Sequence, residues 1–395
     1  MPLTIGQFND GYLPVTDGVV TVARNYTYWL NQKYAKCMLF APTKTDQSFH
    51  EAFEVVGYRS FALPKRPPYR VGVPNIDRGY RRTVNNIPFD LVHTHSPFSS
   101  GSEALRIARK RNIPVVATFH SKFYDDFFEY TKSKTLAKTG VDIVIHFFNK
   151  VNSVWTVSDS TVETLRSYGY KGKITVVPNG TDFHMPADPE AARRQANAFA
   201  GVTDGQPLFL FVGQHIWQKN IRLIAQAAQK LHQSHPGFRL LMVGDGLARR
   251  ELQTWTEEQG LSDVVRFAGV VQDRDLLSAL YLRANAFVFP SVYDNAPCVV
   301  KEASAMGCPT ITVRGCNAAQ GMRDGENGLL CENNLDTLCA QMESVLVDPL
   351  RAAAIGRRAQ QTLAPSWESI VDQVYAEYVK LLYAYTPERA RELGL

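Results

Sequence analysis

The stretch Ser291-Val-Tyr-Asp-Asn-Ala-Pro-Cys-Val-Val-Lys-Glu-Ala-Ser-Ala-Met-Gly-Cys-Pro-Thr310 places one acid, Asp294, eight positions before a second acid, Glu302. A turn and the start of a predicted helix lie between them. A carboxylate beside free backbone N–H groups at a helix N-terminus can bind hydroxyls and an anion together. A nucleotide sugar presents both, because a pyrophosphate joins its sugar to its ribose. The pattern also fits an acidic N-cap before a buried helix with a solvent-facing Glu302.

Short apolar runs flank this stretch, and the same alternation of runs with helical patterns extends along the whole chain. The predicted strands are 3–8, 35–41, 91–95, 115–119, 153–157, 174–177, 208–212, 239–243, 264–267, 286–289, 309–313 and 328–330. The predicted helices include 18–30, 101–110, 160–168, 220–234, 248–260, 274–284, 299–306, 335–345 and 349–362. Strands that alternate with helices favour parallel sheets covered on both faces. The sequence therefore predicts an α/β protein with two Rossmann-like domains facing a central cleft.

The length of 395 residues exceeds what one ordinary core supports, so two domains are the default. We expect an N-terminal, acceptor-side domain over 1–188 and a polar, Ala-rich linker with some helix in it over 189–206. A nucleotide-sugar-binding domain follows over 207–365. Residues 366–395 begin with an amphipathic helix that we expect to pack back toward the N-terminal domain.

Basic residues are concentrated in the first half of the chain. Residues 1–200 carry 25 Lys and Arg against 17 Asp and Glu, whereas the remainder carries 18 against 21. Two basic clusters, 65–70 and 78–82, lie in this half. This asymmetry favours an anionic partner such as a membrane surface, an acidic lipid or a phosphorylated acceptor. Ordinary surface charge is the alternative explanation.

The cysteine and hydropathy patterns indicate the compartment. None of the six cysteines forms a C-x-x-C pair, so we expect free thiols in a reducing cytoplasm rather than disulfides or a zinc site. We find no signal peptide and no apolar run of about 18 residues. We expect a cytoplasmic protein, peripheral at the inner face of the cell membrane, with no nucleic-acid partner. The aromatic- and Lys-rich segment 123–151 fits an interfacial membrane helix or a packing helix equally well.

Several polar residues follow predicted strands, where doubly wound sheets bind ligands. In the first half these are Asp17 and Gly18, then His93 and His95, then His120. Gly18 would let backbone approach a phosphate, although Asp-Gly is also a simple turn. A lone histidine at the end of a strand is more commonly packed and hydrogen-bonded within the protein, and this is the alternative role for His95. Two histidines at neighbouring strand ends are more suggestive of a sugar or acceptor contact.

In the second half, Gly213, Gln214 and Lys219 follow a strand and open a helix. An ammonium at this position would stabilise a phosphate leaving group, although a surface lysine after a turn is the alternative. Asp273-Arg-Asp275 resembles a metal-binding pair, but it directly precedes a helix, so capping is the expected role. We therefore predict no metal site.

Together these pieces resemble the family 4 retaining glycosyltransferases with the GT-B fold. The matching pieces are Thr16-Asp-Gly18, Asp90 to His95, Thr118-Phe-His120, Val157 to Ser160, Val176-Val-Pro-Asn-Gly-Thr-Asp182, Val212 to Lys219, Val243 to Gly246, Phe267-Ala-Gly269 and Asp294 to Glu302. They cover nearly the whole chain in the family's order.

The resemblance implies a role for each site residue. Glu302 would bind ribose hydroxyls and Lys219 the diphosphate, with Gly18 and Asp17 approaching the donor from the first domain. Asp294 and the backbone after it would hold the transferred sugar. His120, Lys219 and Asp294 form the predicted catalytic set; Gly18, Asp17, His95, Gly213, Gln214, Asn295, Ala296, Pro297 and Glu302 form the predicted binding set. Such enzymes retain the anomeric configuration and need no metal, cofactor or side-chain nucleophile.

Two positions depart from the family pattern. Asp294 stands where the family usually has Glu, and Gln214 where it usually has Arg. The shorter Asp294 would change a sugar contact. Uncharged Gln214 would leave the diphosphate to Lys219, unless a protonated His215 compensates. These changes bear on donor identity more than on reaction type.

We therefore expect a retaining hexosyltransferase that uses a nucleotide sugar, a UDP-sugar first, and a lipid or membrane-associated acceptor. A soluble acceptor remains an alternative. The competing classes are a nucleotide-sugar epimerase of the same fold, which would need no acceptor, and a degenerate GT-B protein that only binds a nucleotide. The sequence does not indicate an oligomeric state.

Overall fold

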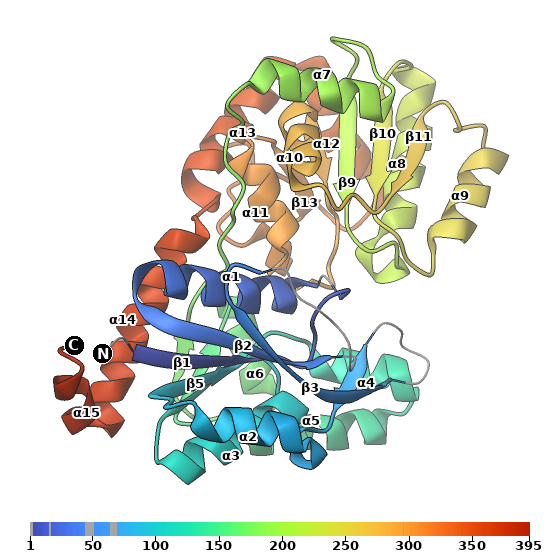
Figure 1. Ribbon diagram of the computed structural model, residues 1–395. Coiled ribbons are helices and arrows are strands. Elements are labelled where there is room, and N and C mark those ends of the chain that lie inside the picture. The colour runs from blue at the N-terminus through green and yellow to red at the C-terminus, as the bar shows by residue number, and fades with distance from the viewer. Residues whose placement is uncertain (1–2, 16, 44–50, 64–68, 295) are drawn as a thin grey trace. The chain divides into compact units, whose positions relative to one another are not determined.

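A computed structural model describes residues 3–15, 17–43, 51–63, 69–294 and 296–395 of the protein. The chain divides into two compact units (Figure 1), the first comprising Met1–Asn179 and Trp367–Leu395 and the second Gly180–Ser366. Each unit is built on one mainly parallel sheet covered by helices. The predicted α/β class with two Rossmann-like domains is confirmed.

The described part of the first unit contains an eight-stranded sheet in the order β4-β3-β2-β1-β5-β6-β7-β8. Its strands are β1 (Leu3–Phe8), β2 (Ala35–Thr43), β3 (Glu54–Ala62), β4 (Arg70–Gly72), β5 (Leu91–Thr94), β6 (Val115–Phe119), β7 (Ser153–Thr156) and β8 (Ile174–Val176). All neighbours pair in parallel except β3 and β4. The order reverses between β1 and β5, which is where open α/β sheets bind ligands.

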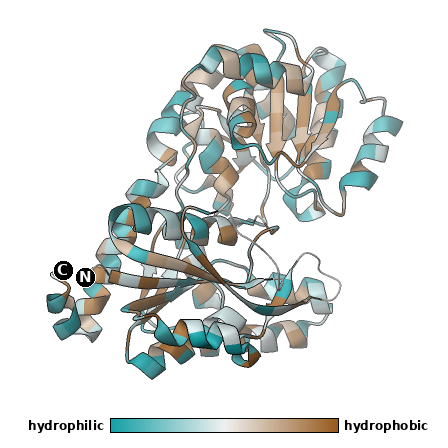
Figure 2. Cartoon of the chain, in the orientation of Figure 1, coloured by the Kyte–Doolittle hydropathy of each residue, from teal (hydrophilic) through white to brown (hydrophobic). Residues whose placement is uncertain are grey.

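The second unit contains a six-stranded parallel sheet in the order β11-β10-β9-β12-β13-β14, again within the described residues. Its strands are β9 (Leu208–Val212), β10 (Arg239–Val243), β11 (Val265–Gly269), β12 (Ala286–Val288), β13 (Thr310–Val313) and β14 (Leu329–Cys331). Here the order reverses between β9 and β12. Figure 2 shows the strands of this sheet as a largely hydrophobic layer, as expected for a sheet buried on both faces.

Helices cover both sheets. In the first unit they are α1 (Gly18–Lys33), α2 (Arg78–Asn86), α3 (Ser99–Arg111), α4 (Phe123–Thr131), α5 (Lys134–Phe148), α6 (Asp159–Ser167), α14 (Trp367–Tyr385) and α15 (Pro387–Glu392). In the second unit they are α7 (Pro189–Ala200), α8 (Ile221–Ser234), α9 (Arg249–Glu258), α10 (Arg274–Arg283), α11 (Cys298–Ala305), α12 (Leu335–Val347) and α13 (Pro349–Leu363). Short 3₁₀ turns are η1 (Pro74–Ile76), η2 (Trp217–Lys219) and η3 (Asn317–Ala319).

The C-terminal helix α14 packs on the first unit. Its Asp372 accepts a hydrogen bond from Lys33 Nζ at 2.5 Å, and its Tyr375 ring stacks on that of Tyr34 with centroids 4.1 Å apart. Tyr378 is fully buried and stacks on Trp155 of β7. The apolar face predicted from the sequence is therefore the face through which α14 packs on this unit.

The second unit begins at Gly180, whereas the N-terminal domain was expected to extend to residue 188. Thr181 pairs with Ser366 in an isolated bridge, and the Phe183 ring joins the second hydrophobic core. Residues 189–206, expected as a linker, contain α7, whose Ala196 and Ala200 are fully buried in that core. The many alanines of this segment, read as linker composition, are the residues that allow α7 to pack closely on its neighbours.

The segment 123–151 forms two helices, α4 and α5, separated by Lys132 in a left-handed conformation. The inner face of α5 buries Val141, Val144 and Phe148 in the core of the first unit. The inner face of α5 is therefore a packing face, whereas Leu136 and Ile143 of the same helix and Phe128 and Tyr130 of α4 are exposed. Among the described residues, the structure contains no helix long and apolar enough to cross a membrane. All six cysteines are free, as predicted.

Candidate active site

Lys219 and Asp294 meet at the point where the second sheet reverses its strand order. Lys219 ends the 3₁₀ turn η2 after β9, two residues before α8 begins, and Asp294 lies in the loop after β12. Because β9 and β12 are neighbours, both loops emerge at the same edge of the sheet. Lys219 Nζ lies 2.7 Å from Asp294 Oδ1, and the two side chains are 11% and 19% exposed. The Ser291 hydroxyl donates to Asp294 Oδ2 at 2.6 Å.

The N-terminus of α11 follows this ion pair. Pro297 is the N-cap residue of α11 and provides no side-chain hydrogen bond there. The partial positive charge of such a helix end favours an anion. Pro297 and Ala296 are half-buried, and Asn295 lies outside the described residues. The arrangement places one ammonium, one carboxylate and one helix N-terminus together.

Glu302 lies on the second turn of α11 and is buried. Tyr281 donates to its Oε2 at 3.3 Å, and Arg274 Nη1 lies 3.3 Å from its Oε1. Burial raises the pKa of Glu302, and the nearby guanidinium of Arg274 opposes that rise. The reading of Asp294 as an N-cap before a solvent-facing Glu302 is therefore wrong: Pro297 is the N-cap, and Glu302 faces other side chains.

Arg274, Tyr281 and Ser291 are site residues that the sequence patterns do not indicate. Arg274 is the middle residue of the Asp-x-Asp pattern, whose two aspartates suggest either a metal-binding pair or, as we expect, a helix cap. That capping is confirmed, because the Asp273 carboxylate accepts from the backbone N–H groups of Asp275 and Leu276. Among the described residues, no group of three or more His, Cys, Asp or Glu side chains is placed to hold a metal ion.

The loop between β9 and α8 contains Gly213, Gln214 and His215. A Cβ added to Gly213 would lie 3.6 Å from Lys219 Cδ, so the glycine borders the lysine stem. Gln214 is exposed. A Cβ on Gly244 would lie only 1.9 Å from the Gly213 carbonyl oxygen. The Gly244–Gly246 turn is therefore required for close packing of two loops, which accounts for its glycines without a bound phosphate.

His215 cannot supply the charge that Gln214 lacks. Its side chain is fully buried against Phe211 and Phe267, and neither ring nitrogen has a hydrogen-bond partner among the described residues. Burial lowers the pKa of His215 to about 4, and the charge of Arg249 lowers it further. The ring is therefore neutral at physiological pH, and the compensation considered from the sequence is wrong.

We expect His215→Leu to stabilise the protein by about 1–2 kcal/mol at pH 7.5, because two buried unpaired nitrogens are replaced by carbon. Above pH 6.5 the ring is neutral in both states. Below it, the unfolded chain takes up a proton that the folded chain resists, so wild-type stability falls toward pH 4. The advantage of the variant should then grow by roughly 1.4 kcal/mol per pH unit. Urea unfolding at pH 7.5 and 5.5 measures this, with exposed His184→Leu as the control; equal pH slopes would contradict it.

In the first unit, Asp17 caps α1. Its Oδ1 accepts from the Val20 N–H at 2.9 Å and its Oδ2 from the Tyr69 hydroxyl at 3.1 Å. A Cβ added to Gly18, the first residue of α1, would meet no described atom within 4 Å. Packing within this unit therefore does not require glycine at position 18.

The three histidines belong to one hydrogen-bonded network at the ends of β5 and β6. His95 Nδ1 lies 3.1 Å from His120 Nε2, and His95 Nε2 lies 2.9 Å from Gln7 Oε1. His93 bridges Tyr378 and Thr118 at 2.6 and 2.7 Å. Burial lowers the pKa of His120 to about 3 and places the pKa values of His93 and His95 well below their usual range.

His120 is the member of this network that remains partly exposed, whereas His93 and His95 are buried. The structure thus separates the predicted roles. His95 supports the His120 ring from inside the unit, and His120 presents a neutral imidazole at the surface. A neutral ring can accept or donate a hydrogen bond to a hydroxyl, but it adds no charge.

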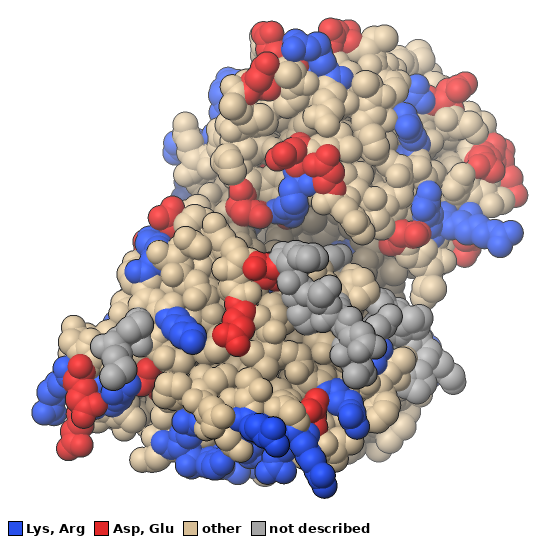
Figure 3. Space-filling view, in the orientation of Figure 1, with Lys and Arg blue, Asp and Glu red and all other residues tan. Residues whose placement is uncertain are grey.

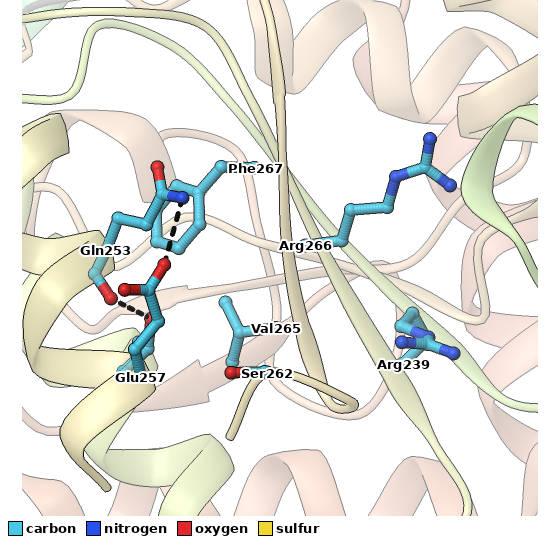
Figure 4. Close-up of a pocket in the computed structure, with 8 residues that line it drawn as sticks. Arg239, Gln253, Glu257, Ser262, Val265, Arg266 and Phe267 are labelled. Carbon is cyan, nitrogen blue, oxygen red and sulfur yellow. Dashed lines mark hydrogen bonds between the residues drawn. The ribbon is translucent and has the colours of Figure 1, made fainter. Parts of the chain in front are cut away.

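A cavity of about 270 Å³ lies elsewhere in the second unit, between α9 and β11 (Figure 4). Gln253 Nε2 donates to Glu257 Oε1 within it at 3.1 Å. The side chains of Arg239 and Arg266 extend away from that of Glu257 in this view. Charges do not converge on this cavity, and it contains none of the predicted site residues.

Known proteins are similar to this chain in sequence and in fold. The family model described as "Glycosyltransferase Family 4" matches residues 16–184, and that described as "Glycosyl transferases group 1" matches residues 193–362. The alpha-monoglucosyldiacylglycerol synthase of Acholeplasma laidlawii is 23% identical over 392 residues, covering 96% of each chain. The structure of a sucrose-phosphate synthase from Thermosynechococcus elongatus has a TM-score of 0.80 at 21% identity and covers 97% of this chain and 100% of its own. The structure of Anabaena HepE in complex with UDP and glucose has a TM-score of 0.73 at 15% identity. The match covers 95% of this chain and 99% of the HepE chain.

Two doubly wound units with these structural neighbours define the GT-B fold. The family models together extend over most of the chain, from residue 16 to residue 362, in the order that the motifs predict. The protein belongs to glycosyltransferase family 4 and acts on nucleotide sugars.

Proposed function

We propose that this glycosyltransferase transfers a hexose from a UDP-sugar, with retention of the anomeric configuration and without a metal ion, to a lipid acceptor at an anionic membrane surface. The observation that carries the proposal is the grouping of Lys219, Asp294, Glu302 and the N-terminus of α11 at one edge of the second sheet. Each group matches one part of a nucleotide sugar: diphosphate, sugar hydroxyls and ribose.

The chemistry of the leaving group supports the roles of Lys219 and α11. As the bond between the sugar C1 and the phosphate oxygen breaks, negative charge builds on the diphosphate. The Lys219 ammonium and the helix N-terminus would stabilise that charge without a metal. The acceptor oxygen forms the new bond to C1 on the same sugar face, and its proton passes to the departing phosphate. The UDP complex of HepE, a structural neighbour, supports uridine as the first nucleotide to test.

The lipid acceptor is supported by the Acholeplasma laidlawii relative, whose name specifies a diacylglycerol product. It is also supported by surface charge. Figure 3 shows Lys and Arg side chains gathered over α2 and the end of α3. The exposed members are Arg78, Arg81, Arg82, Arg109 and Lys110. Such a basic face is attracted to anionic lipids over about one Debye length.

A donor and acceptor screen tests the proposal. The full chain is incubated with UDP-, GDP- and ADP-hexoses, and nucleotide release is measured with diacylglycerol in phosphatidylglycerol vesicles or with soluble sugars. We expect release from a UDP-hexose, stimulated by the vesicles, and an α-linked glycolipid from an α-linked donor. An isomerised nucleotide sugar without acceptor would instead indicate an epimerase. A soluble sugar that works while lipid does not would contradict the lipid acceptor.

Charge reversal on α2 should separate membrane attraction from chemistry. We expect Arg78→Glu/Arg81→Glu/Arg82→Glu to lower binding to phosphatidylglycerol vesicles on the order of 10²-fold, at about 1 kcal/mol for each lost charge. Cosedimentation in low salt measures this. Nucleotide release without lipid should not change. A matched variant that reverses three exposed arginines of the second unit, Arg193, Arg250 and Arg357, is the control. Equal loss in both variants would contradict a role for α2.

A further inference from the structure

Arg274 lies between two carboxylates of the second unit. Its Nη1 is 3.3 Å from Glu302 Oε1, and its Nη2 hydrogen-bonds Asp182 Oδ1. Asp182 is the last residue of the Pro-Asn-Gly-x-Asp segment, one of the pieces in which the sequence resembles family 4. The proposed reaction assigns this aspartate no role. The contact with Arg274 links it to the carboxylate that we expect to bind ribose.

A second route joins the same residues through aromatic rings. The Arg274 guanidinium carbon lies 4.2 Å from the centroid of the Phe183 ring, which is next to Asp182 in sequence. Phe183 packs edge-to-face on Tyr281 at 5.8 Å, and the Tyr281 hydroxyl donates to Glu302 Oε2. The contacts therefore close into a ring in which both oxygens of Glu302 are held, one through Arg274 and the other through Tyr281.

The two segments that supply these contacts, residues 181–183 and the start of α10, are each held in place by further hydrogen bonds. The Thr181 N–H donates to the Pro365 carbonyl at 2.9 Å, and the Phe183 N–H donates to Thr181 Oγ1 at 3.1 Å. Arg274 itself is the first residue of α10, whose N-terminus Asp273 caps. Its side chain is 47% exposed, whereas that of Glu302 is 8% exposed. A half-exposed arginine that two carboxylates and a ring hold in place is oriented rather than free to move.

We propose that Arg274, oriented by Asp182 and Phe183, is a positioning residue that keeps the Glu302 carboxylate ionised and directed toward the nucleotide ribose. The inference rests on the proposed role of Glu302 in ribose binding. The strength of the contact between Glu302 and the ribose would then depend on Arg274, a cation that lies on α10 and not on α11. A carboxylate buried without a cation would tend to take up a proton and lose one acceptor for the ribose hydroxyls.

The titratable groups around Glu302 determine the pH dependence that we expect for ribose binding. Arg274 and Tyr281 face it from α10, Asp182 from the segment before α7, and Cys298 from α11 itself. Burial raises the pKa of Cys298 to about 12 and that of Tyr281 well above its usual range, so both stay neutral. Removal of Arg274 should raise the pKa of Glu302 further. Ribose binding should then weaken at a higher pH than in the wild-type protein.

Calorimetric titration of the full-length protein with UDP, GDP and ADP between pH 5 and 8 tests the proposal, since all three share the ribose diphosphate. For each nucleotide that the wild type binds, we expect Arg274→Gln to weaken binding about tenfold at pH 7, the scale of one lost charge-assisted hydrogen bond. The midpoint of the acid-side loss should move to higher pH. Arg274→Lys keeps the positive charge and should keep the wild-type midpoint, even where affinity is only partly restored.

Glu302→Gln is the matched comparison, because it removes the titrating carboxyl and should abolish the acid-side loss. Thermal unfolding of every variant excludes misfolding. If Arg274→Gln binds like the wild type at every pH while Glu302→Gln is impaired, the positioning role is wrong and the ribose role of Glu302 stands. If Glu302→Gln also binds like the wild type, the ribose role fails. If only Arg274→Gln is impaired, Arg274 contacts the nucleotide directly and the inference is overturned.

Discussion

Lys219→Met is expected to lower kcat on the order of 10²–10³-fold, the range found when one preorganised donor to a developing negative charge is removed. Lys219 is the cation placed 2.7 Å from Asp294 at the start of α8. Methionine keeps most of the side-chain volume and removes the charge. Uncharged, exposed Gln214 and neutral His215 in the same loop cannot replace that charge. Steady-state assays at saturating UDP-hexose measure the effect.

Two variants separate this effect from a loss of folding. Lys230→Met removes a lysine from α8, the helix that follows Lys219. Lys230 Nζ pairs with Asp336 at 2.6 Å, but both side chains are exposed. We expect that variant to retain wild-type activity, because exposed ion pairs contribute little. Lys219→Met leaves Asp294 unpaired, so the double variant with Asp294→Asn should regain stability without regaining activity. A single variant that folds and keeps kcat within threefold of wild type would refute the role of Lys219.

The sequence predicts the apolar strands of the fold far better than the polar ones. The apolar runs that became β1, β6, β9 and β10 have the predicted bounds. β3 and its neighbour β4, at one end of the first sheet, were not predicted, because β3 is partly exposed and carries polar residues such as Glu54 and Arg59. The segment of α7 was expected to be a linker with some helix, and the sequence did not show that this helix packs into the second core through Ala196 and Ala200.

The sequence places the candidate residues near strand ends, but it does not give their contacts. Lys219 and Asp294 each follow a predicted strand and Glu302 lies on the helix after Asp294, and those positions are visible in the sequence. The ion pair joins residues 75 positions apart and exists because β9 and β12 are neighbours, which the sequence does not specify. Arg274 reaches Glu302 from a third segment. His215 was misjudged because burial, which sets its pKa, is a property of the folded loop.

The Lys219–Asp294 pair has a consequence for the order of events at the site. The carboxylate of Asp294 pairs with the ammonium that, in the proposed function, binds the diphosphate. If both roles hold, the diphosphate would compete with Asp294 for Lys219. Asp294 would then be available for the sugar hydroxyls once the phosphates are bound. On this proposal the pair would link nucleotide binding to sugar binding within one unit.

Asp294→Asn should accordingly change binding and catalysis in opposite directions. The amide keeps the shape of the side chain but releases Lys219, so we expect UDP to bind a few-fold more tightly. The same change weakens the acceptor for the sugar hydroxyls, so we expect kcat to fall on the order of 10²-fold. Titration with UDP and steady-state assays measure the two effects. Asp336→Asn removes the exposed partner of Lys230 and serves as the control, with neither effect expected.

Asp294→Glu tests whether this position sets the donor sugar. The longer side chain would move the carboxylate by one methylene relative to Ser291, which now donates to it at 2.6 Å. A site that hydrogen-bonds a sugar hydroxyl discriminates strongly against a sugar that lacks it or carries it elsewhere. We therefore expect the ratio of kcat/KM for UDP-glucose and UDP-galactose to change by about tenfold or more, the equivalent of one good hydrogen bond. If Asp294→Asn weakens UDP and Asp294→Glu scales both sugars equally, Asp294 only supports Lys219, and the sugar contact must come from elsewhere.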